Sequence, residues 1–158
     1  MRYGKGQTAG GEGAEAALAG IRAGRAGAGL DFMKISIKTD SKRQVVDITD
    51  QVQAELKGNG LVNVFVQHTT AAVTLADLDP GTDEDYLRAL EAMTPPEKWQ
   101  HPHDPSHFPD HLWSALVGQS VSVPFKNGKL ELGSWQRLVL AELDGPRERS
   151  VIITVLAT

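Results

Sequence analysis

The stretch LVNVFVQHTTAAVTL, residues 61–75, decides how the surrounding chain folds. Its beginning, residues 61–66, and its end, residues 73–75, alternate in the way expected of strands with one buried face. A histidine and two threonines, His68, Thr69 and Thr70, stand between the two runs. The pattern therefore predicts two successive strands joined by a polar connection that is a candidate functional site.

The chain on both sides of this stretch also consists mainly of short strand patterns. Further strands are expected at residues 34–38, 44–48, 120–124, 130–132, 135–142 and 150–156. Asn127-Gly128 is a strong signal for a tight hairpin turn. Since strands outnumber helices and neighbouring strands have short connections, we expect a single-domain α+β fold, mostly an antiparallel β-sandwich.

Two to three short helices are expected beside the strands. The first covers residues 51–57, and the second begins at Thr82 or Asp83 and ends before Pro95. The third covers residues 106–117, where the spacing of apolar residues predicts a buried stripe of Phe108, Leu112, Ala115 and Leu116.

Residues 1–32 differ in composition from the rest of the chain. Nine glycines and eight alanines occupy 17 of these positions. Such a segment offers too little apolar surface to offset the entropy of ordering it. We interpret it as a disordered leader, or as the product of an upstream translation start, and assign residues 33–158 to the folded domain.

Bulk composition excludes several classes of function. The net charge of −4 and the pI of about 5.7 argue against nucleic-acid binding. The sequence has no cysteine, which excludes disulfides and thiolate metal sites and fits a cytoplasmic protein. No apolar run approaches the roughly 18 residues of a membrane span, so no membrane association is expected.

The histidines suggest a metal site. Apart from His68, they all lie within eleven residues: His101, His103, His107 and His111. Neutral imidazole is a common ligand of zinc and similar ions. A three-histidine site with an open position that includes His68 and His111 is therefore possible. The alternative is that each histidine is a solvated surface side chain.

Other polar residues could complete such a site. Asp77, at a strand end, could bind a divalent ion or accept a proton. Arg147 or Arg149 could clamp a phosphate, with Thr69 and Thr70 as hydroxyl donors and Gln136 pointing into the site. The alternatives are a charged hairpin for the arginines, ordinary strand positions for the threonines and a core role for the Trp135-Gln136 segment.

Taken together, these segments resemble the YjbQ-like family of secondary thiamine-phosphate synthases. The resemblance covers residues 33–158 and rests on these pieces, in the order of the family: Asp47-Ile-Thr49, His68-Thr-Thr-Ala71, Asp79-Pro80 followed by Asp85, His101, His111-Leu112, Leu132-Gly-Ser-Trp-Gln136 and residues 142–149. Asp77 departs from the family, which usually has Glu there; its side chain is shorter by about 1.5 Å, one C–C bond.

The resemblance implies a homotrimer with pockets near subunit interfaces. It implies His68, His101 and His111 as the site histidines, holding a divalent ion such as zinc or magnesium, with Asp85 and Glu142 close by. The implied activity joins a hydroxymethylpyrimidine diphosphate to a thiazole phosphate and releases diphosphate. A metal-dependent hydrolase and a non-catalytic binder of a small anionic metabolite are the competing hypotheses.

Overall fold

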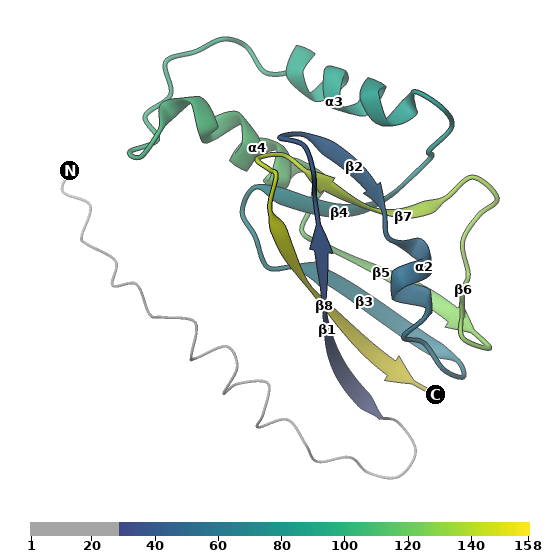
Figure 1. Ribbon diagram of the computed structural model, residues 1–158. Helices are drawn as coiled ribbons and strands as arrows, with labels where there is room; N and C mark the ends of the chain where they lie inside the picture. Colours follow the sequence, from purple (N-terminus) through teal and green to yellow (C-terminus); the bar gives the residue numbers. More distant parts are fainter. Residues whose placement is uncertain (1–28) are drawn as a thin grey trace.

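The computed structural model describes residues 29–158, in which two antiparallel sheets face each other (Figure 1). Sheet A has the strand order β1-β8-β3-β5-β6, and sheet B has the order β2-β7-β4. The strands of sheet A are β1 (Leu30–Lys38), β8 (Glu148–Ala157), β3 (Gly60–Val66), β5 (Ser120–Lys126) and β6 (Lys129–Leu130). Those of sheet B are β2 (Gln44–Asp47), β7 (Arg137–Glu142) and β4 (Ala71–Ala76).

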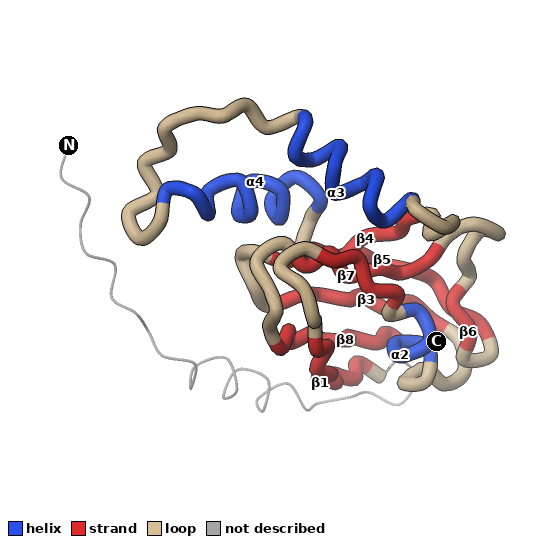
Figure 2. The backbone as a smooth tube through the Cα atoms, turned by 45° about the horizontal axis from the view of Figure 1, so that its top comes forward, coloured by secondary structure: helices blue, strands red, loops and turns tan. Residues whose placement is uncertain are grey.

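Three short α-helices and one 3₁₀ turn complete the described part. They are α2 (Thr49–Gln53), α3 (Thr82–Ala92), the 3₁₀ turn η1 (Pro105–His107) and α4 (Phe108–Val117). Figure 2 shows α3 and α4 together on one side of the sheets. The predicted single-domain α+β fold with antiparallel sheets and short helices is confirmed. Within residues 29–158, none of the helices has the length and apolar character needed to cross a membrane.

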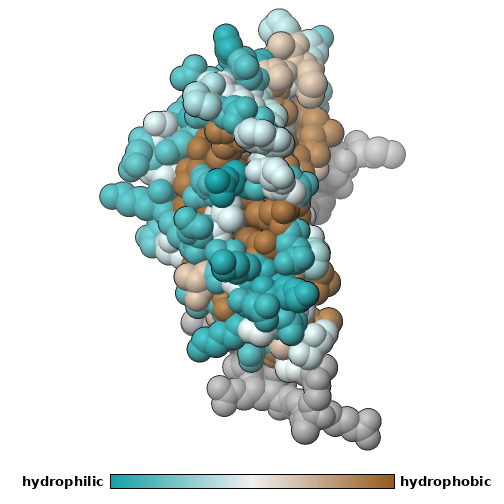
Figure 3. Space-filling view, turned by 90° about the vertical axis from the view of Figure 1, so that its right-hand side faces the viewer, coloured by the Kyte–Doolittle hydropathy of each residue, from teal (hydrophilic) through white to brown (hydrophobic). Residues whose placement is uncertain are grey.

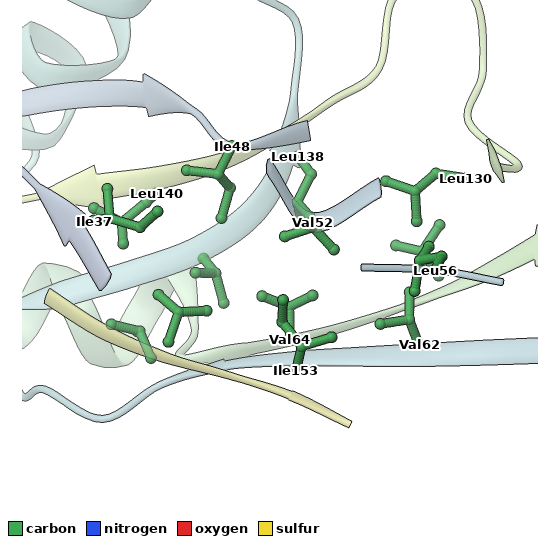
Figure 4. Packing of buried hydrophobic residues seen from close by; sticks show 14 of the residues in the cluster. Ile37, Ile48, Val52, Leu56, Val62, Val64, Leu130, Leu138, Leu140 and Ile153 are labelled. Carbon is green, nitrogen blue, oxygen red and sulfur yellow. The ribbon is translucent and has the colours of Figure 1, made fainter. Parts of the chain in front are cut away.

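Apolar side chains from the two sheets fill the space between them. Ile48, Leu138 and Leu140 on the side of sheet B approach Val64 and Ile153 of sheet A (Figure 4). All five are almost completely buried. The alternation seen in the sequence produces this core, because every second residue of a strand points to the same face. The packing fixes the strand ends on which the polar candidates lie.

Strand β1 begins earlier than the sequence pattern predicts. Leu30 pairs with Leu156 of β8, and the pairing continues without interruption to Lys38 and Glu148. Residues 30–32, which we assigned to the leader, therefore belong to sheet A. The rest of the predicted leader, residues 1–28, lies outside the described residues.

Two local predictions have different outcomes. The Asn127-Gly128 hairpin is confirmed: both residues have positive φ, +51° and +73°, as a tight turn between twisted strands requires. The helix predicted at residues 51–57 instead begins at Thr49. The Asp47 carboxylate accepts a hydrogen bond from the Thr49 backbone N–H at 2.9 Å, which starts the helix two residues earlier.

The buried face of α4 differs from the predicted stripe. Its buried residues are Asp110, Trp113 and Ser114, whereas Leu116 is 63% exposed. The Ser114 hydroxyl donates to the Ala71 carbonyl at 2.7 Å, and Arg43 both pairs with Asp110 and lies over the Trp113 ring. The prediction was wrong because these polar contacts with β4 and with the loop after β1 rotate the helix away from its apolar stripe.

Candidate functional site

The connection between β3 and β4, residues 67–70, holds His68 in a defined orientation. The backbone N–H of Ser150 on β8 donates to His68 Nε2 at 2.9 Å. A nitrogen that accepts is unprotonated, so the neutral ring carries its proton on Nδ1. Burial, followed by the positive charge of Arg149, lowers the pKa of His68 below its ordinary value. The ring is therefore neutral near pH 7, with a single N–H donor.

The neighbouring residue, Thr69, orients a second histidine. Its carbonyl oxygen lies 3.1 Å from Nδ1 of His111 on α4. Because a carbonyl can only accept, Nδ1 of His111 carries the proton and its Nε2 keeps a free lone pair. The ring of His101, from the loop before α4, lies 4.8 Å from the His111 ring between centroids. The loop and α4 thus bring two imidazoles together beside Thr69.

The three expected metal ligands do not assemble within one chain. His101 and His111 are neighbours, but His68 directs Nε2 to the backbone of Ser150. Among residues 29–158, no set of three or more histidines and carboxylates is arranged to hold a metal ion. A catalytic zinc site takes three protein ligands. The described residues of a single chain therefore do not fit such a site.

Glu142 and Arg149 form a buried ion pair beneath the connection. Arg149 donates to both carboxylate oxygens of Glu142, with Nε 2.6 Å from Oε2. The terminal nitrogen of Arg149 also lies 3.1 Å from the hydroxyl of Thr70 and 3.3 Å from its carbonyl oxygen. Since both charged side chains are almost fully buried, they support the loop from inside. In this arrangement neither reaches solvent, where a phosphate would arrive.

The pKa of Glu142 shows how well this carboxylate is compensated. Burial alone would raise it, but hydrogen bonds from Arg149, from the Asp144 backbone N–H and from the Thr39 hydroxyl lower it below its ordinary value. Glu142 therefore stays ionised at neutral pH. A carboxylate held this strongly in its charged form is a weak proton acceptor.

The 3₁₀ turn η1 brings His107 near Asp144 in the turn after β7, and neither is among the predicted site residues. His107 Nε2 lies 3.8 Å from an oxygen of Asp144 and 3.5 Å from one of Asp104. Arg147 donates to the Asp144 carbonyl oxygen and carboxylate, both at 2.6 Å. Within residues 142–149 the sequence points to Glu142, Arg147 and Arg149, and not to Asp144. The signal that could have identified it is the charge pattern of Asp144-Gly-Pro-Arg147, beside a histidine-rich segment.

Three predicted site residues lie elsewhere. The register pairs Ala71 with Glu142 and Ala76 with Arg137, so Asp77 and Gln136 lie at the end of sheet B opposite Thr70. Asp77 accepts from the Asp79 backbone N–H, and Gln136 accepts from that of Gly133. Asp85 pairs with Arg88 on the exposed side of α3. These contacts are local, and the fold does not bring the three residues to His68.

An open hollow borders the histidine connection. Its volume is about 480 Å³, and the residues that line it are Phe65, Val66, Gln67, His68, Thr69 and Gln119. Gln119 donates to the carbonyl oxygen of His68 and to the Ser114 hydroxyl, which ties β5 to the connection. The hollow thus offers one neutral imidazole and a threonine to a small molecule at the end of β3.

Comparisons with known proteins agree on one family. A model described as "UPF0047 protein YjbQ-like" matches residues 33–158. A UPF0047 protein of Archaeoglobus fulgidus is 40% identical over 126 residues, which cover 78% of this chain and all of that protein. The Bacillus subtilis protein YugU is 34% identical, and the alignment covers 77% of this chain and 96% of that protein.

Solved structures give the same fold. A "YbjQ-like protein of unknown function" from Sulfolobus solfataricus superposes with a TM-score of 0.74 at 34% identity, covering 83% of this chain and 99% of that one. A conserved hypothetical protein from Thermus thermophilus superposes with a TM-score of 0.73 at 36% identity, covering 78% of this chain and 99% of that one.

The expectation of thiamine-phosphate synthesis at a histidine cluster is wrong. The matching family model and these relatives are described as UPF0047 proteins, one of them as of unknown function, and none by that activity. The described residues also hold no three-ligand metal group. The resemblance correctly identified the family but implied an activity that these comparisons do not support.

Proposed function

The chain belongs to the YjbQ-like UPF0047 family, and we propose that it is an enzyme that transfers a proton to or from a small phosphorylated or otherwise anionic substrate. The proposed site is the connection between β3 and β4. The observation that carries the proposal is the hydrogen bond between His111 Nδ1 and the Thr69 carbonyl oxygen, which leaves His111 Nε2 as an oriented proton acceptor.

His68 and His111 have complementary roles in this proposal. Nε2 of His68 is occupied by the Ser150 backbone N–H, so His68 can only donate, through Nδ1. In His111 the roles are reversed: Nδ1–H donates to the Thr69 carbonyl oxygen, so the neutral ring can only accept a further hydrogen bond, through Nε2. His68 and Thr69, whose carbonyl oxygen lies beside the His111 ring, are adjacent residues, which supports a donor and an acceptor acting on the same small molecule.

The charges around His68 favour an anion. Arg149, Arg147 and Lys34 all act to lower the pKa of His68, while Glu142 acts in the opposite direction. The positive potential that disfavours a protonated imidazole also attracts a negatively charged ligand. Nδ1–H of His68 and the hydroxyl of Thr69 are hydrogen-bond donors for its oxygen atoms.

We extend the proposal to the assembly. A divalent ion would be held by His101 and by ligands from other copies of the chain in a homotrimer, and not by His111 Nε2, whose lone pair accepts the proton. No chemical step depends on that ion here. A cytoplasmic location is part of the same proposal and is supported by the lack of cysteine in the sequence. Light scattering after size exclusion measures the mass of the assembly, and a monomer would refute the trimer.

Anion binding is tested by titrating inorganic phosphate and a small phosphomonoester into ¹⁵N-labelled protein. We expect the backbone signals of residues 67–70 to shift, and His68→Ala to weaken binding by about tenfold or more. His103→Ala is the matched control, because it also removes an imidazole, and the His103 ring borders His101 rather than the 67–70 connection. Equal binding by all three proteins would refute the site.

Proton transfer is tested on any phosphorylated compound that binds and is turned over. His111→Ala is expected to reduce kcat about 100-fold or more, because it removes a general base, while binding changes little. His103→Ala, which removes another imidazole of the same histidine-rich segment, is the control. An unchanged pH profile and kcat in His111→Ala would contradict the assigned role.

A further inference from the structure

A second cavity lies on the other face of sheet B, beneath α3. Its volume is about 320 Å³, within the range of small-molecule sites. Strands β2, β4 and β7 form the floor and α3 forms the roof; the residues that matter here are Val45, Ala76, Val139, Ala141, Leu87 and Leu90. Because the lining is almost entirely apolar, the cavity suits the hydrocarbon part of a ligand.

Helix α3 leaves part of its apolar side exposed. The helix is 11 residues long, and none of its residues is buried. Leu87 and Leu90 are only half-buried, and Tyr86 and Met93 are exposed although they line the cavity. Figure 3, which faces the end of α3 that follows β4, shows hydrophobic surface exposed between hydrophilic side chains. A ligand beneath α3 would remove this apolar surface from water.

Acidic residues flank two of the cavity's lining residues in the sequence. Ala76 lines the cavity and is followed by Asp77, and Tyr86 lines it and is preceded by Asp83-Glu84-Asp85. Two arginines lie nearby: Arg88 pairs with Asp85, and Arg137, opposite Ala76 in the sheet, lies 3.8 Å from a carboxylate oxygen of Asp47. The acidic residues therefore outnumber the cations. Carboxylates at the rim attract a positively charged group, and the exposed Tyr86 ring offers a cation–π surface.

We propose that the cavity binds an organic cation: an amine whose positive nitrogen lies at the acidic end and whose hydrocarbon or aromatic body lies beneath α3. An engineered apolar cavity of about 150 Å³ accepts benzene, so the larger cavity here accommodates a body of roughly twice that size. This site is separate from the anion site at His68 and takes a ligand of opposite charge.

The test uses three probes with the same eight-carbon body: octylamine, octanol and octanoate. Binding is followed on the full chain by isothermal titration and by backbone signals of residues 82–93, at low salt because screening weakens the rim charges. Octylamine is expected to bind about tenfold tighter than octanol, and octanoate weakest. No binding of octylamine or octanol, or octanoate binding as tightly as octylamine, would overturn the proposal.

Two variants fill the cavity from opposite sides. Ala89→Trp changes an exposed lining residue on α3, and Ala76→Phe changes a half-buried one on β4. Each is expected to weaken octylamine and octanol by about tenfold or more. Because Ala89 is exposed, Ala89→Trp is expected to fold, and it tests the cavity even if Ala76→Phe fails to fold. Unchanged octylamine binding in a folded Ala89→Trp protein would overturn the assignment.

A third variant separates the contribution of the acidic residues from that of the apolar cavity. Asp83→Asn combined with Glu84→Gln is expected to abolish the preference for octylamine over octanol without weakening octanol. Asp50→Asn, which removes a negative charge on α2 instead of α3, is the matched charge control. A retained preference would overturn the role of the rim. If octylamine does not bind and Ala89→Trp instead lowers the mass of the assembly, a second copy of the chain fills this site and the proposal is wrong.

Discussion

Arg149 holds both carboxylate oxygens of Glu142 in the interior of the domain, with its Nε 2.6 Å from Oε2. The two residues are 1% and 0% exposed. The same carboxylate accepts from Thr39 after β1 and from the backbone of Asp144. This pair therefore joins β7, β8 and the end of β1 directly beneath Thr70.

Arg149→Met is expected to lower the free energy of unfolding by about 3–5 kcal/mol, because it leaves a buried carboxylate without its counter-ion. Urea unfolding measures the loss. The control is Arg149→Met combined with Glu142→Leu, which removes both charges and should lose less than the single variant. A loss below about 1 kcal/mol in the single variant would show that the pair is not buried in solution.

Stability is expected to depend on pH through His68. Burial and then Arg149 lower the pKa of His68 in the folded protein, whereas the unfolded value is about 6.5. The unfolded state therefore binds the proton more readily, so stability is complete above about pH 6.5 and falls as pH drops toward the folded pKa. Urea unfolding of the protein across about pH 5 to 8 measures this dependence.

The matched variant for this dependence is His68→Gln, whose amide oxygen can still accept from the Ser150 backbone N–H. The variant lacks a titrating ring, so its stability should fall less steeply below about pH 6.5. Parallel curves for the two proteins would mean that other groups cause the dependence.

Ser114→Ala is expected to cost about 1–3 kcal/mol of stability, because the Ala71 carbonyl loses a buried donor at 2.7 Å. Thermal and urea unfolding check the value. Ser134→Ala, at an exposed serine before β7, should change stability by no more than about 0.5 kcal/mol. Equal effects at both serines would contradict the role of Ser114 in docking α4 on β4.

Two truncations test where sheet A begins. A chain that starts at Met33 loses the β-pairs from Leu30–Leu156 to Phe32–Thr154, whereas a chain that starts at Gly29 keeps them. The shorter chain should melt several degrees lower, since about 1 kcal/mol shifts Tm by roughly 2–8 °C in domains of this size. Identical melting temperatures would show that residues 30–32 add nothing to the sheet.

The fold could be predicted from the sequence to the extent that its signals are local. The alternation around residues 61–75 gave β3 and β4, and Asn127-Gly128 gave the hairpin, since period and turn chemistry act over a few residues. The buried face of α4 could not be predicted, because Arg43 and Ala71, far away in sequence, select Asp110 and Ser114 over the apolar stripe.

The candidate site shows the same division. His111 lies beside the Thr69 carbonyl oxygen, whereas Asp77 and Gln136 lie at the far end of sheet B, and Asp144, which lies near His107, was not a candidate. The places of Asp77 and Gln136 depend on strand register, because one end of a strand cannot be told from the other until its partner strand is known. The places of His107 and His111 depend on how η1 and α4 pack against distant segments.

By itself the sequence determined the order and type of the elements, the polar break at residues 67–70 and the family, because these are properties of short segments. Only the tertiary structure decided what each polar side chain faces: His68 a backbone amide of β8, Arg149 a buried carboxylate, and Asp77 its own turn. The reason is physical: such contacts join residues up to 82 positions apart, and packing of the two sheets, not local preference, brings those residues together.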